Sequence, residues 1–125
     1  MKVKNSAVWL SKEPLDNLMA LKLPISTGYK LARLAAKLNE RRNAIDVVRN
    51  GLIKKYGQEK EGNFTVKPES ENWTKFVEDF NSLMALEEEM VIEVLKIPSK
   101  WDGKILEIES EILMPLLDFV EVIDG

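Results

Sequence analysis

The amino-acid sequence predicts an α-dominated α+β fold, in which an antiparallel helical hairpin and shorter helices pack on a small β-sheet. Two long stretches have apolar residues at helical spacing, and short β-branched stretches lie beside them. The chain has 125 residues, of which 45% are hydrophobic and 31% are charged, as is typical of a globular protein. A chain of this length can bury one hydrophobic core, so we expect residues 1–125 to form a single domain.

The first helix of the hairpin is predicted over residues 28–56. Its apolar residues form a heptad-like stripe with one vacancy. Arg41 occupies that vacancy, with Arg42 beside it. Gly57 follows the helix and is typical of a left-handed C-cap. The stripe consists of Leu31, Leu34, Leu38, Ile45, Val48 and Leu52.

The second helix is predicted over residues 71–89. Its apolar face is long enough to pair with much of residues 28–56, which favours an antiparallel hairpin. The polar connection between the two helices contains a short predicted strand at residues 63–66. The apolar face consists of Trp73, Phe76, Val77, Phe80, Leu83 and Met84.

The rest of the chain is predicted to supply shorter elements. Partial alternation predicts a strand over residues 2–10, and a β-branched run predicts another over residues 90–97. Short helices are predicted over residues 12–23 and 110–119. We expect the small sheet to form from residues 2–10, 63–66 and 90–97.

The composition excludes several kinds of chemistry. The sequence contains no cysteine and no histidine, which excludes disulfides, the usual zinc sites and catalysis by a Cys or His side chain or a Ser-His-Asp triad. It also lacks the glycine-rich patterns that bind phosphates and the turn that presents a catalytic serine. We therefore expect no catalytic residue, no cofactor and no metal.

The apolar stretches of the sequence are short. The first residues do not resemble a signal peptide, and no run approaches the roughly 20 apolar residues of a membrane span. We expect no membrane partner. The absence of cysteine fits a reducing compartment, so the expected location is cytoplasmic.

Charge is divided unevenly between the two halves of the chain. Residues 1–60 contain thirteen Lys or Arg and five Asp or Glu, a net charge of +8, whereas residues 61–125 contain five and sixteen, a net charge of −11. This division indicates either that the basic half folds onto the acidic half or that the protein presents opposed faces to partners. It is also compatible with self-association into a homo-oligomer.

The basic side chains of residues 28–56 suggest an interaction surface. Clustered Lys and Arg neutralise phosphates in nucleic-acid-binding proteins, so a nucleic-acid-binding accessory role is one alternative function. Interleaved aromatic residues are missing and the pI is about 5.1, so a solvated helix face is the simpler explanation. The candidate surface comprises Lys30, Arg33, Lys37, Arg49, Lys54 and Lys55, together with the acidic Glu87, Glu88 and Glu89.

The acidic triplet, followed by Glu93, suggests a second alternative. Clustered carboxylates bind Mg²⁺ or act as acid and base, as in a carboxylate-based, metal-dependent hydrolase. Three consecutive glutamates point in different directions around a helix, however, and a further pair, Glu121 and Asp124, lies far along the sequence. An exposed helix end is the simpler explanation for the triplet.

The arginines in the vacancy of the stripe need a partner. A buried unpaired charge costs on the order of several kcal/mol, so a carboxylate should lie close by. We expect a buried ion pair between Arg41 or Arg42 and Glu78, Asp79 or Glu87 of the facing helix. A functional arginine is the alternative.

Three features of the middle of the chain recur together in other small proteins. A leucine-rich helix ends in Lys-Tyr-Gly (Ile53 to Gly57), an acidic loop with a glycine leads into a short strand (Glu61 to Val66), and an amphipathic helix runs into a β-branched stretch (Leu83 to Ile97). Over residues 30–117 the chain thereby resembles small proteins, most of unknown function, encoded by tailed bacteriophages and prophages. The resemblance implies a phage setting in the host cytoplasm and an α-dominated α+β fold, and it implies no active site.

These observations favour a non-enzymatic protein that acts by protein–protein interaction. The absence of the usual catalytic residue types and the segregated charge are the basis for this hypothesis. The expected role is that of a small phage assembly component or of a modulator of a host protein.

Overall fold

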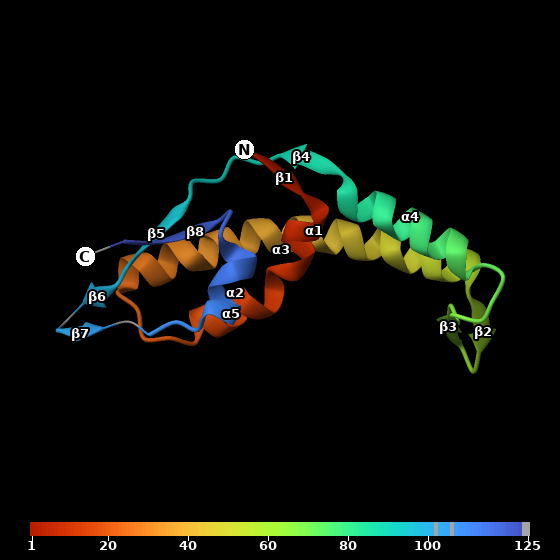
Figure 1. Cartoon of the computed structure of the whole chain (residues 1–125), viewed down its shortest axis with the longest axis horizontal. Helices are drawn as coiled ribbons and strands as arrows, with labels where there is room; N and C mark the ends of the chain where they lie inside the picture. The colour runs from red at the N-terminus through yellow and green to blue at the C-terminus, as the bar shows by residue number, and fades with distance from the viewer. Residues whose placement is uncertain (102, 106, 124–125) are drawn as a thin grey trace.

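The structure confirms an α-dominated α+β fold (Figure 1). It is a computed structural model that describes residues 1–101, 103–105 and 107–123. Asp124 of the Glu121–Asp124 pair therefore lies outside the described residues.

The long helix α3, Ile25–Tyr56, is the axis of the fold. It begins three residues before the predicted start, with Pro24 at the N-cap position. Its 32 residues span about 48 Å, and its leucine stripe is buried along the N-terminal half. Helix α4, Trp73–Ala85, lies antiparallel to the C-terminal half of α3 and forms the predicted hairpin (Figure 1).

The connection between α3 and α4 contains a small β-hairpin. Strand β3, Asn63–Thr65, corresponds to the predicted short strand, and it pairs with β2, Gln58–Lys60, in a stretch predicted to be loop. The turn between them contains Glu61 and Gly62, both with positive φ. A glycine tolerates this conformation without strain, which explains the acidic loop with a central glycine.

The first ten residues are mostly helical, so the predicted strand over residues 2–10 is wrong beyond its start. Strand β1 covers Lys2–Lys4, and helix α1 covers Asn5–Leu10. Asn5 and Val8, three residues apart, are both buried, which is the spacing of a helix face. The Asn5 side-chain amide donates to the Leu83 carbonyl at 2.8 Å and so fixes α1 against α4.

Helix α2, Lys12–Met19, ends four residues earlier than predicted. The remaining elements follow α4 along the chain. They are β4 (Glu87–Glu89), β5 (Leu95–Pro98), β6 (Lys100–Trp101), β7 (Lys104–Ile105), α5 (Ser110–Leu113), the 3₁₀ helix η1 (Met114–Leu116) and β8 (Val120–Ile123).

Among the described residues the strands form four separate two-stranded sheets and not the single sheet predicted. The β1–β4, β2–β3 and β6–β7 pairs are antiparallel, and β5–β8 is parallel. The predicted helix over residues 71–89 is wrong at its end, because Glu87–Glu89 pair with β1. The register sets Lys2 opposite Glu89 and Lys4 opposite Glu87, and such opposite charges stabilise a cross-strand pair.

The hydrophobic core surrounds the N-terminal half of α3. It joins the first and last parts of the chain, since Val8, Leu15 and Leu18 share it with Ile97 and Phe119. The predicted helix over residues 110–119 is interrupted at Pro115 within η1, and β8 then carries the chain back along β5.

Gly57 ends α3 without the predicted left-handed conformation. Its φ of −87° and ψ of 169° are extended, so the predicted C-cap geometry is wrong. The glycine is required for a different reason. A Cβ atom at this position would overlap the Ile53 carbonyl oxygen and lie 2.9 Å from the Thr65 carbonyl oxygen, because β3 passes close to the helix end.

The Gly57→Ala variant should lower the free energy of unfolding by about 1–3 kcal/mol, because neither backbone oxygen can move freely. Gly51→Ala is the matched control. Gly51 lies within α3 with no atom within 4 Å of an added Cβ, so alanine should there stabilise the protein by about 0.5–1 kcal/mol. Urea denaturation followed by circular dichroism measures both values. Equal effects of the two substitutions would contradict the close approach of β3.

Candidate functional site

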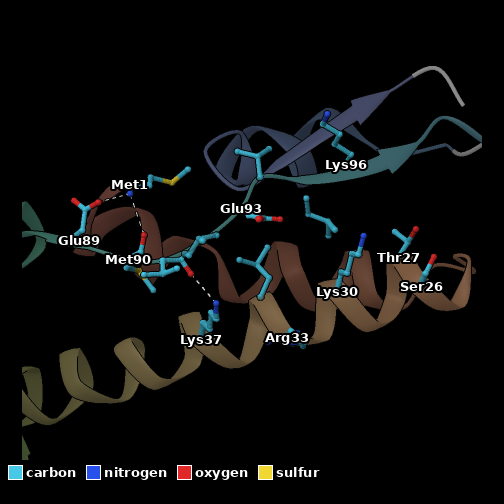
Figure 2. Close-up of a pocket in the computed structure, with 15 residues that line it drawn as sticks. Met1, Ser26, Thr27, Lys30, Arg33, Lys37, Glu89, Met90, Glu93 and Lys96 are labelled. Atoms are coloured by element: carbon cyan, nitrogen blue, oxygen red, sulfur yellow. Dashed lines mark hydrogen bonds and ion pairs between the residues drawn. The ribbon is translucent and has the colours of Figure 1, made fainter.

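A groove lies between the N-terminal half of α3 and the extended chain of residues 89–96 (Figure 2). Its volume is about 870 Å³. Leu34 of α3 and Ile92 and Leu95 of the extended chain give it an apolar lining. It brings together chain segments from two distant parts of the sequence, which makes it the leading candidate site.

The α3 wall of the groove is basic. Lys30, Arg33 and Lys37 follow one another at spacings of three and four residues, so they share one side of the helix. The Lys37 ammonium donates to the Val91 carbonyl at 2.8 Å and ties the two walls together. The Arg33 guanidinium lies 6.0 Å from the ring centroid of Tyr29. Lys30 extends from α3 toward the opposite wall (Figure 2).

The opposite wall is held in place at its start by the first residue. The Met1 ammonium forms an ion pair with Glu89 at 2.6 Å, and the Met90 amide donates to the Met1 carbonyl at 2.8 Å. Further along, the Glu93 carboxylate lies between the two walls (Figure 2). With Lys96, the lining contains four Lys or Arg against two Glu, so the groove has a net positive charge.

The middle of this wall lacks a strand partner, and it begins with a tight turn in which the Ile92 amide donates to the Met90 carbonyl at 3.1 Å. We call residues 91–94 the unpaired segment. Strand β1 pairs with the chain as far as Glu89, and β8 pairs with it from Leu95, so no described strand pairs with the residues between. The prediction of a strand over residues 90–97 therefore holds only from Leu95. Val91 is 88% exposed within this segment.

The groove collects only part of the predicted interaction surface. Lys30, Arg33, Lys37 and Glu89 line it. Glu87 and Glu88 lie in the β1–β4 ladder. The remaining basic residues, Arg49, Lys54 and Lys55, lie on the C-terminal part of α3, away from the groove.

Arg41 is buried, and its carboxylate partner is not one of those predicted. Its Nε atom lies 3.7 Å from a carboxylate oxygen of Glu88 and donates to the Asn5 side-chain oxygen at 2.8 Å, while Nη2 donates to the Val3 carbonyl. Burial lowers the pKa of Arg41, and the Glu88 carboxylate opposes that shift. The partner differs from the prediction because Glu88 lies in a strand against β1, next to Arg41.

Arg42 is also buried, and no carboxylate among the described residues forms an ion pair with it. It donates to Asn39 at 2.6 Å, to the Val8 carbonyl at 3.1 Å and to the Ser11 hydroxyl at 2.8 Å. Burial lowers its pKa, and Asp16 opposes the shift. Both arginines therefore fix the first part of the chain onto α3.

None of the predicted acidic partners forms an ion pair with these arginines, and Glu87 lies opposite Lys4 in the β1–β4 ladder. Glu78 is exposed on α4. Asp79 instead accepts a hydrogen bond of 2.6 Å from the Tyr56 hydroxyl, which joins the end of α3 to α4.

The carboxylates that the structure describes do not gather into a metal site. Within residues 1–101, 103–105 and 107–123, no group of three or more Asp or Glu side chains is arranged to hold a metal ion. The triplet lies along β4, where successive side chains alternate between the two faces of the strand. This geometry gives no support to a metal-dependent hydrolase.

Sequence reasoning missed the role of Met1 and Lys96 in the groove. Their proximity to α3 depends on the β1–β4 and β5–β8 ladders, which join segments far apart in the chain. One signal in the sequence could have predicted this pairing. The acidic triplet at residues 87–89 and the lysine-containing segment at residues 2–4 have opposite charges, and a β-branched run follows the triplet.

Comparisons with known proteins add no relative. No protein-family model matches the chain, and neither a search of curated proteins nor a search of solved structures found a match. Among the described helices, none combines the length and apolar character needed to cross a membrane.

Proposed function

We propose that this protein acts by binding another protein, and that an extended segment of the partner pairs with residues 91–94 along the basic groove. The observation that carries the proposal is the unpaired segment. It is rich in β-branched residues, belongs to no helix or strand, and has a ladder on each side.

The composition of the unpaired segment favours a strand. Val91, Ile92 and Val94 are residue types that fit a pleated sheet, yet no described strand of this chain completes the pairing. Adding a strand from a partner to such an exposed edge is a common mode of peptide recognition, with backbone hydrogen bonds supplying affinity. The exposed Val91 side chain would be covered in such a complex.

The charge of the groove indicates the chemistry of the partner. The four basic side chains of its lining outnumber the two acidic ones, Glu89 and Glu93. Acidic residues on the partner would therefore be favoured, and the apolar lining favours β-branched residues at alternate positions. The proposed ligand is an extended segment that alternates Asp or Glu with Val or Ile.

The proposed setting follows from the resemblance of residues 30–117 to small proteins of tailed bacteriophages. In that setting the partner is a phage protein, for which this chain is an assembly component, or a host protein that it modulates. The absence of cysteine fits the reducing cytoplasm of a host cell.

A nucleic-acid-binding role has weaker support. Arg41 and Arg42 are buried in the middle of the basic stretch of α3. They separate the basic residues that line the groove from those nearer the C-terminal end of the helix. Glu89 and Glu93 also line the same groove and would repel a phosphate backbone. The same two carboxylates would also repel an acidic peptide. The difference is that a protein segment can form backbone hydrogen bonds with residues 91–94, which a phosphate backbone does not offer.

A selection from displayed random peptides tests the proposal. Peptides that bind the wild-type protein should be enriched in alternating acidic and β-branched residues. The double variant Lys30→Glu/Arg33→Glu should bind the enriched peptides at least about tenfold more weakly, because it reverses the charge of the groove. Hydrogen exchange should show slower exchange of the amides of residues 91–94 when peptide is bound.

The matched control is Lys12→Glu/Lys22→Glu, which makes the same charge change at exposed sites outside the groove and should leave binding unchanged. Gel shifts with duplex DNA across a salt series test the alternative. Salt-dependent DNA binding that the groove variant abolishes, without any enrichment of acidic peptides, would overturn the proposal in favour of nucleic-acid binding.

A further inference from the structure

The far end of the α3–α4 hairpin has no buried residue. We call residues 46–82 the distal arm. It contains the C-terminal part of α3, the β2–β3 hairpin and most of α4, and it projects beyond the rest of the molecule (Figure 1). All of these residues are described, and none between Ile45 and Leu83 is buried. Two helices alone do not bury each other's apolar residues fully.

The distal arm is nevertheless rich in large apolar side chains. Trp73, Phe76 and Phe80 follow one another along α4, with ring centroids 5.9 Å and 6.1 Å apart, and all three are only partly buried. On α3, Val47 is 72% exposed and Val48 is 48% exposed. The main hydrophobic core includes none of these residues. An apolar surface of this kind on a helical hairpin indicates a binding face.

The charges of the arm are self-complementary. At the end of α3, Lys54 and Lys55 are exposed, while the Asp46–Arg49 pair at 3.7 Å is balanced. At the start of α4 and just before it, four acidic residues outnumber two basic ones, Lys67 and Lys75. These acidic residues are Glu69, Glu71, Glu78 and Asp79.

We propose that the distal arm binds the distal arm of a second copy of this chain, forming a four-helix bundle. In the order α3, α4, α3, α4 around the bundle, with both arms pointing the same way, each basic helix end lies between the acidic start of its own α4 and that of the partner's α4. The arrangement covers the partly exposed aromatic residues and pairs unlike charges, whereas a uniformly charged partner would complement only one of the two helices. The interface lies apart from the groove and does not depend on what binds there.

A charge-swap experiment tests this pairing. Sedimentation or light scattering over a range of protein concentrations should show a concentration-dependent dimer for the wild-type protein. Lys54→Glu/Lys55→Glu and Glu71→Lys/Glu78→Lys should each self-associate at least about a hundredfold more weakly, because twofold symmetry repeats every like-charge contact. An equimolar mixture of the two variants should recover the dimer.

The exposed-site variant Lys12→Glu/Lys22→Glu is again the control, and it should remain dimeric. A wild-type protein that stays monomeric, or charge variants that stay fully dimeric, would overturn the proposal. If circular dichroism shows that a reversed variant loses helix, carbodiimide cross-linking of wild-type chains decides the question. In a mixture of ¹⁴N and ¹⁵N chains, links between copies should join Lys54 or Lys55 to Glu71 or Glu78, and their absence would contradict the bundle.

Discussion

Replacing Arg41 by alanine should lower the free energy of unfolding by about 3 kcal/mol. The guanidinium donates to the Val3 carbonyl and to the Asn5 side-chain oxygen, and both residues are buried. Without Arg41 these two acceptors lose a donor in a place where water does not reach freely, and each such loss costs about 1–3 kcal/mol. Glu88 contributes less, because its side chain is 73% exposed.

Urea denaturation of wild type and variant measures this effect. Arg33→Ala is the control, since Arg33 is an exposed arginine on the same helix and should change stability by no more than about 0.5 kcal/mol. The effect of Arg41 should not depend on pH near neutrality. Burial lowers the pKa of Arg41 from the ordinary value of an arginine. When the pKa of a basic group is lower in the folded than in the unfolded protein, the protein becomes more stable as pH rises between these two pKa values. For arginine this change lies in the strongly alkaline range. The difference between wild type and variant should therefore stay constant between about pH 5 and pH 9, and a loss no larger than that of Arg33→Ala would contradict the structural role.

The long helix could be predicted from the sequence because its signal is local. The stripe from Leu31 to Leu52 lies within one stretch of chain, and α3 contains all of it. The same stripe pointed to Arg41 as a buried arginine, since a charged residue in an apolar row must find partners. It did not identify Glu88, because the facing surface at that point is a strand and not the predicted helix.

The strands were harder to predict because their partners are distant in sequence. Glu87–Glu89 have poor strand propensity and become a strand only through pairing with Lys2–Lys4. Residues 91–94 have good propensity and stay unpaired, because no described strand lies opposite them. Propensity therefore failed in both directions, and in both cases the presence or absence of a partner strand was decisive.

The charge division of the sequence is only partly neutralised within the fold. The β1–β4 ladder sets Lys2 and Lys4 against Glu89 and Glu87, and Arg41 contributes a contact with Glu88. Helical spacing placed Lys30, Arg33 and Lys37 on one side of α3, where they line the groove. It gave no sign that Lys54 and Lys55 would lie on a separate arm, because that depends on where the core ends along α3.

Replacing Phe119 by alanine should lower the free energy of unfolding by about 3–5 kcal/mol, the largest effect expected of a single substitution here. Phe119 has no exposed surface and belongs to the core that α1, α2 and α3 share with the last part of the chain. Its carbonyl accepts a hydrogen bond of 2.8 Å from the Leu95 amide, at the start of the β5–β8 ladder. A cavity at this position therefore weakens the contact that holds the parallel strands on the body.

Phe119→Leu is the matched variant for this cavity argument, because it keeps most of the apolar volume and should cost less than half as much as alanine. Hydrogen exchange shows which parts of the molecule lose stability in the Phe119→Ala variant. If the core is cooperative, the amides of α3 near Leu38 and those of β5 should lose protection together. The β2–β3 hairpin contributes no residue to this core and should change little. Equal stability of the alanine and leucine variants would mean that the site collapses around the smaller side chain, and that the last part of the chain is held by its backbone ladder and not by Phe119.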